Sequence, residues 1–261
     1  MSSRHLSIAR RLAALDSIAR PAAERFDAGP ALAARVAVLA GAFNPPTLAH
    51  LALLDAARAA ARAAPPPAGI HDSRFTIHDS GLAIQGAAML STRNADKAVS
   101  GATLAQRVEM LLALQEGGSA LAVMAVNAAR LVEQGEALRE SFPGVAFDFV
   151  AGFDTFERLF APRYYGDMAA ELRPFFANHR VIATNRARAT MDDLAAFVAT
   201  PEVRPFASRI VMAAVPEAEA AMSSTAAREA AAAGHGHGSL PAAVARYIEA
   251  HGLYRERQAG V

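Results

Sequence analysis

The stretch Val36-Ala-Val-Leu-Ala-Gly-Ala-Phe-Asn-Pro-Pro-Thr-Leu-Ala-His50 joins an apolar run, a glycine, two prolines and a histidine. Val36 to Ala40 is short, continuous and apolar, which is typical of a parallel strand that is buried on both faces. Pro45 and Pro46 interrupt regular structure, and the Ala- and Leu-rich residues 48–64 favour a helix. A loop between a strand and a helix gathers backbone N–H groups at the positive end of the helix dipole. The stretch therefore predicts a phosphate-binding loop.

A second polar turn lies far downstream, where Met222 and three hydroxyl residues precede two alanines and Arg228. Serine and threonine are favoured helix N-caps, so we expect a helix that begins here and ends near Ala233. Its free N–H groups can bind phosphate, and Arg228 adds a fixed positive charge one turn into the helix. Taken together, the two motifs resemble the two signatures of the nucleotidylyltransferase superfamily. The second motif alone is explained equally well by an ordinary helix cap, so the pairing carries the resemblance.

The resemblance implies a reaction in which a substrate phosphate attacks the α-phosphorus of a nucleoside triphosphate carrying Mg²⁺, and pyrophosphate leaves. Sites of this kind work by positioning and charge stabilisation, without a covalent enzyme intermediate. The resemblance implies that His50 and Arg228 are the catalytic residues. It also implies a Gly-x-Asp motif at the end of a strand, whose carboxylate accepts hydrogen bonds from ribose hydroxyls. The implied nucleotide-binding residues are Gly41, Ala42, Phe43, Thr47, Gly152, Asp154, Ser223, Ser224 and Thr225. A packed histidine at a helix start and an acidic helix N-cap are the alternative interpretations of His50 and Asp154.

Three further features bear on the acceptor. Residues 240–254 resemble the closing helix of nicotinate and nicotinamide mononucleotide adenylyltransferases, and Arg107 to Met110 resembles their Arg-x-x-Met. Thr47 stands where many members of the superfamily have a histidine, and threonine occurs there among adenylyltransferases that act on nicotinamide mononucleotide. The resemblance thus implies ATP and a pyridine mononucleotide as partners, in NAD biosynthesis. Lys97 or Arg93 is the candidate for the mononucleotide phosphate.

Two alternatives stay open at this point. One keeps the fold but uses another phosphorylated acceptor, such as phosphopantetheine or an alcohol phosphate; the other is a non-catalytic nucleotide-binding regulatory module. The family commonly stacks a tryptophan on the pyridine ring, and this chain contains none. Other flat rings can stack instead, although core packing is the competing explanation for each of them: Phe153, Phe156, Phe160, Tyr164 and Tyr165.

Composition narrows the class of protein. A chain of 261 residues suits one α/β domain, and we expect a helical extension over residues 1–30 and a nucleotidylyltransferase domain over 31–261. A net charge of +1 argues against nucleic acid as a partner. No apolar run approaches the roughly 20 residues of a membrane helix, so we expect no membrane partner and a cytoplasmic location. The Arg-rich first twenty residues are alternatively an organelle presequence, and a homo-oligomer is compatible with the sequence.

Strand and helix patterns alternate along the whole chain. This alternation predicts an α/β fold with a doubly wound parallel sheet, and the resemblance implies that it is the Rossmann-like nucleotidylyltransferase fold. Residues 5–20 and 22–27 read as helix, and the expected strands are 36–40, 87–91, 121–126, 145–150, 180–183 and 210–215. Two histidine-containing segments, 70–80 and 234–238, invite a metal site, but polar loops explain them equally well and we predict no protein-held metal.

Overall fold

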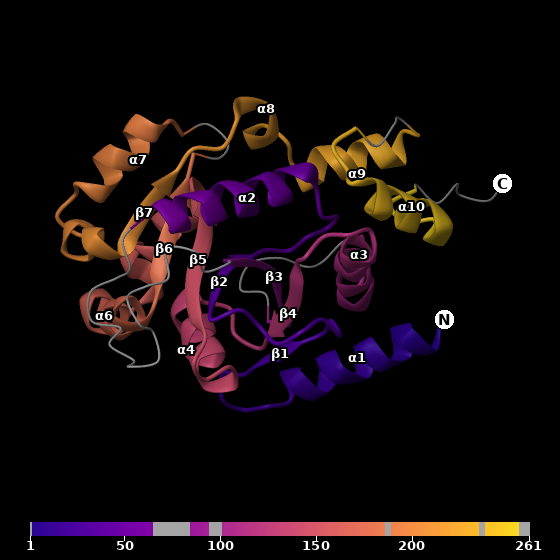
Figure 1. Ribbon diagram of the computed structural model, residues 1–261, viewed down its shortest axis with the longest axis horizontal. Helices are drawn as coiled ribbons and strands as arrows, with labels where there is room; N and C mark the ends of the chain where they lie inside the picture. Colours follow the sequence, from indigo (N-terminus) through magenta and orange to yellow (C-terminus); the bar gives the residue numbers. More distant parts are fainter. Residues whose placement is uncertain (1, 65–83, 94–100, 186–188, 235–237, 256–261) are drawn as a thin grey trace.

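The computed structural model describes residues 2–64, 84–93, 101–185, 189–234 and 238–255. Within these ranges a seven-stranded sheet is covered by helices on both faces (Figure 1). The strand order is β1-β4-β3-β2-β5-β6-β7, and every neighbouring pair is parallel except β1 with β4. The chain winds outward from β2 first in one direction and then in the other. The predicted doubly wound α/β fold is therefore confirmed.

Each of the six expected strands is present. Their apolar runs become buried strands because helices cover both faces of the sheet. The bounds are β2 (Arg35–Ala40), β3 (Gln85–Ser91), β4 (Ala122–Val126), β5 (Ala146–Gly152), β6 (Arg180–Thr184) and β7 (Ile210–Ala213).

Alternate residues of each strand pack into two separate cores. In β2, Ala37 and Leu39 belong to one core and Val36 and Val38 to the other, as the two-residue period of a strand requires. The first core is covered by α1 (Ser3–Asp16), α2 (Leu48–Ala63), α3 (Leu104–Glu116), α9 (Ser224–Ala232) and α10 (Ala242–His251). The second is covered by α4 (Leu131–Ser141), α5 (Phe153–Leu159), α6 (Met168–Asn178) and α7 (Met191–Val198). Short turns of helix complete the chain: η1 (Pro162–Tyr164), η2 (Arg204–Arg209) and α8 (Glu217–Ala220).

Two elements differ from the prediction: a strand in the N-terminal segment and a helix in the second half of the chain. Residues 22–27 were expected to be helical, but Ala23–Arg25 form β1, antiparallel to β4. The edge of β4 needs backbone partners, and this pairing supplies them, whereas a second helix would not. The sequence did not indicate α6, because Pro174 lies inside it and proline normally disfavours a helix interior.

A buried carboxylate ties β1 to the rest of the sheet. The side chain of Asp27 has no exposed surface. Four groups donate hydrogen bonds to it: Arg25 Nε at 2.9 Å, Val123 N at 2.8 Å, Gly29 N at 2.9 Å and Gln115 Nε2 at 3.1 Å. Burial alone would raise the pKa of Asp27, but these hydrogen bonds, led by that of Arg25, outweigh it and lower the pKa to about 2.

This carboxylate should make the stability of the protein depend on acid pH. Because the folded pKa is lower than the ordinary value of about 3.9, the stabilisation is complete above that value and is lost as the pH falls towards 2; it amounts to about 2 kcal/mol. We expect Asp27→Asn to unfold more easily at neutral pH and to lose less stability between pH 4 and pH 2. Urea unfolding across this range measures both effects. Asp55→Asn is the control, because the Asp55 side chain is 74% exposed; equal pH slopes in wild type and Asp27→Asn would contradict the assignment.

Candidate nucleotide-binding site

The loop from Gly41 to Thr47 leaves the carboxyl end of β2 and enters α2. Gly41 N donates to Met89 O at 3.0 Å, so the loop starts as a continuation of the sheet. Phe43 adopts a left-handed φ of 44° and is almost completely buried. Its ring packs on the imidazole of His50 with centroids 4.9 Å apart. A side chain at position 41 would place its Cβ 3.3 Å from the Phe43 ring, so glycine gives that ring its space.

His50 lies in the first turn of α2 and is held by Thr47, the N-cap of this helix. Nδ1 of His50 accepts a hydrogen bond from Thr47 N at 3.0 Å and lies 2.8 Å from Thr47 Oγ1. A nitrogen that accepts from a backbone N–H carries no proton in the neutral ring, so Nε2 carries it. His50 therefore acts as part of the helix cap and carries its ring proton on Nε2.

The second motif lies directly against this loop. Ser223 is the N-cap of α9, and its hydroxyl accepts a hydrogen bond from Ala226 N at 3.1 Å. Ser224 Oγ donates to Pro45 O at 2.9 Å, and Arg228 Nη1 donates to Asn44 O at 2.6 Å. Residues more than 170 positions apart are thus hydrogen bonded to each other. The N-terminus of α9 is fixed beside the loop that precedes α2.

Two further hydrogen bonds of Arg228 lie within α9. Arg228 Nη1 also contacts Ser224 O at 3.3 Å, and Arg228 Nη2 donates to Thr225 Oγ1 at 3.3 Å. Thr225 is exposed and Arg228 half-buried. The guanidinium is therefore oriented by hydrogen bonds to Asn44 O, Ser224 O and Thr225 Oγ1.

Gly152 and Asp154 lie at the carboxyl edge of the sheet, where ligands of open α/β folds bind. Gly152 is the last residue of β5 and the N-cap of α5, opposite Thr184 of β6. Asp154 is exposed in the first turn of α5. Because Gly152 is the cap residue, the alternative that Asp154 is an N-cap is wrong.

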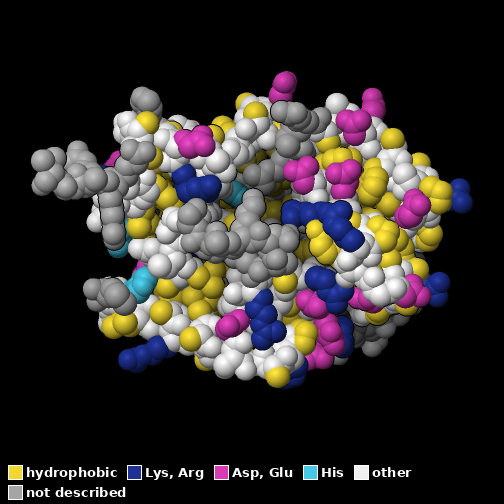
Figure 2. Space-filling view, turned by 180° about the vertical axis from the view of Figure 1, so that it is seen from behind, with side chains coloured by type: hydrophobic (Ala, Val, Ile, Leu, Met, Phe, Trp, Pro, Cys, Tyr) yellow, Lys and Arg dark blue, Asp and Glu magenta, His cyan; other side chains and the backbone are white. Residues whose placement is uncertain are grey.

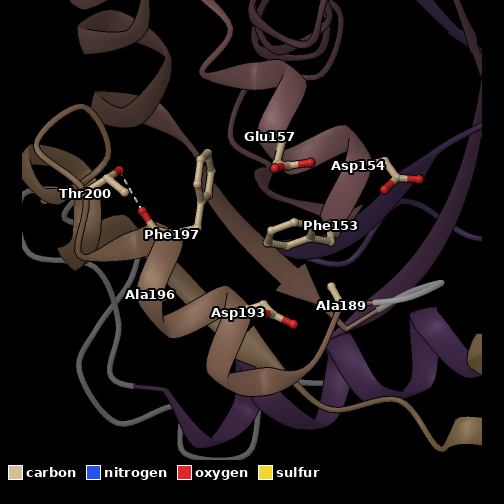
Figure 3. Close-up of a pocket in the computed structure, with 8 residues that line it drawn as sticks. All are labelled: Phe153, Asp154, Glu157, Ala189, Asp193, Ala196, Phe197 and Thr200. Carbon is tan, nitrogen blue, oxygen red and sulfur yellow. Dashed lines mark hydrogen bonds between the residues drawn. The ribbon is translucent and has the colours of Figure 1, made fainter.

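Asp154 also borders an open cleft of about 710 Å³ between α5 and α7. Figure 3 shows the rings of Phe153 and Phe197 beside this space, with Glu157 and Asp193 on either side. The two rings meet edge to face with centroids 5.8 Å apart. The described residues that line it are Phe153, Asp154, Glu157, Ala189, Asp193, Ala196, Phe197 and Thr200. Such a cleft offers an aromatic wall and hydrogen-bond acceptors to a flat, polar ring.

The aromatic candidates for stacking separate clearly by burial. Phe156 and Phe160 belong to the second core and are buried, so they are packing residues. Phe153, Tyr164 and Tyr165 are half-buried. Tyr165 Oη donates to Leu159 O at 2.6 Å, which orients that ring.

Of the two side chains predicted to bind the acceptor phosphate, the structure describes one. Lys97 lies outside the described residues, as does the segment 71–83 with its two His-Asp pairs. Arg93 is described, and its Nη2 donates to Asp16 O at 3.0 Å and Ile18 O at 3.1 Å. Arg93 therefore binds the end of α1.

Two side chains that the sequence did not assign to the site stabilise the loop: Asn44, within the loop, and Arg107 of α3. Asn44 is 8% exposed, and its Oδ1 accepts hydrogen bonds from Ala102 N at 3.3 Å and Tyr254 Oη at 2.8 Å. Arg107 is buried and donates through Nη1 to Ala42 O at 3.4 Å. Burial lowers the pKa of Arg107, and the charge of Arg228 acts in the same direction. Arg107 and Tyr254 both lie in segments that carry the family resemblance, but Asn44 has no signal beyond its place in the loop.

The surface of the described chain is mixed in charge. On the face shown in Figure 2, acidic and basic side chains are interspersed among hydrophobic ones. Within the described ranges, no three His, Asp or Glu side chains gather as a metal-binding group. In the same ranges, no helix has both the length and the apolar character needed to cross a membrane.

Comparison with solved structures finds proteins that are similar to this chain in fold. Nicotinic acid mononucleotide adenylyltransferase of Plasmodium falciparum complexed with NaAD has a TM-score of 0.57 and 14% identity, covering 84% of this chain and 97% of that chain. The same protein complexed with APC has a TM-score of 0.54 and 13% identity, covering 84% and 96%. No protein-family model and no curated protein matches the sequence. At these identities the likeness concerns the fold alone.

The tautomer of His50 gives a direct check of the site geometry. We expect the neutral imidazole to carry its proton on Nε2, because Nδ1 accepts from Thr47 N. Nitrogen chemical shifts of ¹⁵N-histidine-labelled protein, assigned with His50→Gln, distinguish the two tautomers. Thr47→Val should leave the tautomer unchanged, because the backbone donor is retained. A proton found on Nδ1 would show that the described cap is wrong.

Proposed function

We propose that this chain transfers the adenylyl group of ATP to nicotinamide or nicotinate mononucleotide and releases pyrophosphate. The observation that carries the proposal is the direct contact between the two motifs, through Arg228 with Asn44 and Ser224 with Pro45. These contacts place two helix N-termini and a fixed guanidinium beside each other. A triphosphate is the ligand whose charge and length suit that arrangement.

The likeness in fold supports the choice of reaction. The solved relatives in fold are nicotinic acid mononucleotide adenylyltransferases, one of them complexed with NaAD. Mg²⁺ enters here as part of the substrate, because it is held chiefly by triphosphate oxygens and water.

The chemistry requires charge stabilisation more than proton transfer. A phosphate oxygen of the mononucleotide forms a bond to the α-phosphorus of ATP, and the bond from that phosphorus to the bridging oxygen of pyrophosphate breaks. The attacking phosphate is already ionised near neutral pH, so no general base is needed. In our proposal, Nε2–H of His50 donates to the α-phosphate, where negative charge develops, and Arg228 stabilises the departing phosphates.

The nucleoside parts would lie along the carboxyl edge of the sheet. In this arrangement Gly152 and Asp154 bind a ribose, and the cleft beside Asp154 offers the Phe153 ring to a flat base. Phe153 is thus our candidate for the role that the family gives to tryptophan, together with Tyr164 and Tyr165. Lys97 remains our candidate for the mononucleotide phosphate.

Pyrophosphate release tests the proposal directly. The purified protein is incubated with ATP, Mg²⁺ and either mononucleotide, and both pyrophosphate and dinucleotide are measured. We expect both products in equal amounts. No turnover with either mononucleotide across several divalent metals would contradict the proposal. Turnover with phosphopantetheine or an alcohol phosphate would instead assign another acceptor, and ATP binding without any turnover would indicate a regulatory module.

His50 variants separate the catalytic role from the capping role. We expect His50→Ala to lower kcat by raising the activation free energy by about 2 to 4 kcal/mol, the range found when a donor to developing charge is removed. The affinity for ATP should change much less. His50→Asn should lose as much kcat but less stability, because an amide oxygen can replace Nδ1 as acceptor for Thr47 N. His251→Ala, at the exposed end of α10, is the control; equal losses of ATP binding and kcat would contradict the role.

A further inference from the structure

The end of α10 turns the chain back towards the nucleotide loop. Gly252 ends the helix in the left-handed region with φ of 58°, and Leu253 N donates to Ile248 O at 3.0 Å. Tyr254 follows, also with a positive φ, of 63°. A left-handed residue directly after the last turn is a common way to end a helix. The Tyr254 ring then packs against the first core and its hydroxyl meets Asn44, 210 positions earlier in the sequence.

The hydroxyl of Tyr254 is one link in a chain of hydrogen bonds around the loop. It donates to Asn44 Oδ1 at 2.8 Å, and the same oxygen accepts from Ala102 N at 3.3 Å. Ala102 O accepts from Arg107 Nε at 2.9 Å, and Arg107 Nη1 donates to Ala42 O at 3.4 Å. The chain therefore starts at one loop residue, Asn44, and returns to another, Ala42.

The position of the Tyr254 ring depends on Gly101, which has no side chain. A Cβ at Gly101 would lie 2.8 Å from Tyr254 Cε1 and 3.1 Å from Asn44 Oδ1, and Gly101 has a φ of +96°. Any other residue there would be strained and would displace the ring. Burial raises the pKa of Tyr254 to about 12, although the charges of Arg107 and Arg228 oppose the rise. The hydroxyl thus keeps its proton and stays a donor over the working pH range.

We infer that Tyr254 is a positioning residue for adenylyl transfer, acting through Asn44 to hold the loop 41–47 in the conformation that binds phosphate. The inference rests on the proposed function. Asn44 O receives the guanidinium of Arg228 at 2.6 Å, so a shift of Asn44 moves the loop relative to the charge that faces the triphosphate. The chain's last described turn thereby bears on the geometry of the transfer.

Tyr254→Phe tests the inference, because it removes only the hydroxyl. Tyr247→Phe is the matched control: Tyr247 lies on α10 and donates to Glu109 Oε2 at 2.5 Å, away from the loop. Hydrogen exchange of the peptide covering residues 41–47 reports loop order without any substrate. We expect exchange in this peptide to be several-fold faster in Tyr254→Phe and unchanged in Tyr247→Phe. We also expect kcat to fall about 3- to 10-fold in Tyr254→Phe, the range that loss of one ordinary hydrogen bond produces, with a much smaller change in KM for ATP.

A double mutant distinguishes action through Asn44 from a general loss of stability. In an Asn44→Ala background, Tyr254→Phe should change kcat no further, since the partner is already absent. Additive losses, unchanged exchange in the loop, or a kcat loss equal to that of Tyr247→Phe would each overturn the inference. An active wild type with unaffected variants contradicts only the role of Tyr254. A wild type that releases no pyrophosphate with either mononucleotide contradicts the proposed function itself.

Discussion

The structure depends on a loop that is buried without being regular. Residues 43–47 are buried, yet they belong to neither strand nor helix, so the loop cannot satisfy its own backbone groups. Buried carbonyl oxygens need hydrogen-bond donors from elsewhere. Donors arrive from α9, where Ser224 and Arg228 bind Pro45 O and Asn44 O, and Arg107 of α3 binds the neighbouring, exposed Ala42 O. This single requirement explains why helices from the middle and the end of the chain converge on one point.

Much of the sheet could be predicted because parallel strands leave a simple trace. Buried on both faces, they appear as continuous apolar runs, and all six such runs became strands. β1 has no such trace: it is three residues long and polar at two of them, and the unpaired edge of β4 decides its conformation. α6 contains a proline, and packing of Leu172, Phe175 and Phe176 into the second core outweighs the local preference.

Some features of the candidate site arise from neighbouring residues in the sequence, and others arise from residues that are far apart. The glycine, the proline pair and the serine cap act on their own neighbours, so short motifs reveal them. The contact between Tyr254 and Asn44 joins residues 210 positions apart, and nothing local in either residue indicates it. Burial likewise assigns Phe156 and Phe160 to the core and leaves Phe153 beside the cleft, a distinction that residue type alone does not make. Thr47 supports His50, because its backbone N–H donates to His50 Nδ1.

The register of the first strand has a consequence for the order in which a nascent chain can fold. Ala23 pairs with Val126, so during synthesis the segment with Ala23 must wait for about a hundred further residues before its partner exists. Contacts of such long range are slow to form, because a large loop must close before they are made. The central strands can associate earlier, since β2 and β3 follow one another in the chain. The sheet is therefore expected to grow from its middle, with the N-terminal strand added after β4 and the loop at Asn44 completed only when residue 254 has been synthesised.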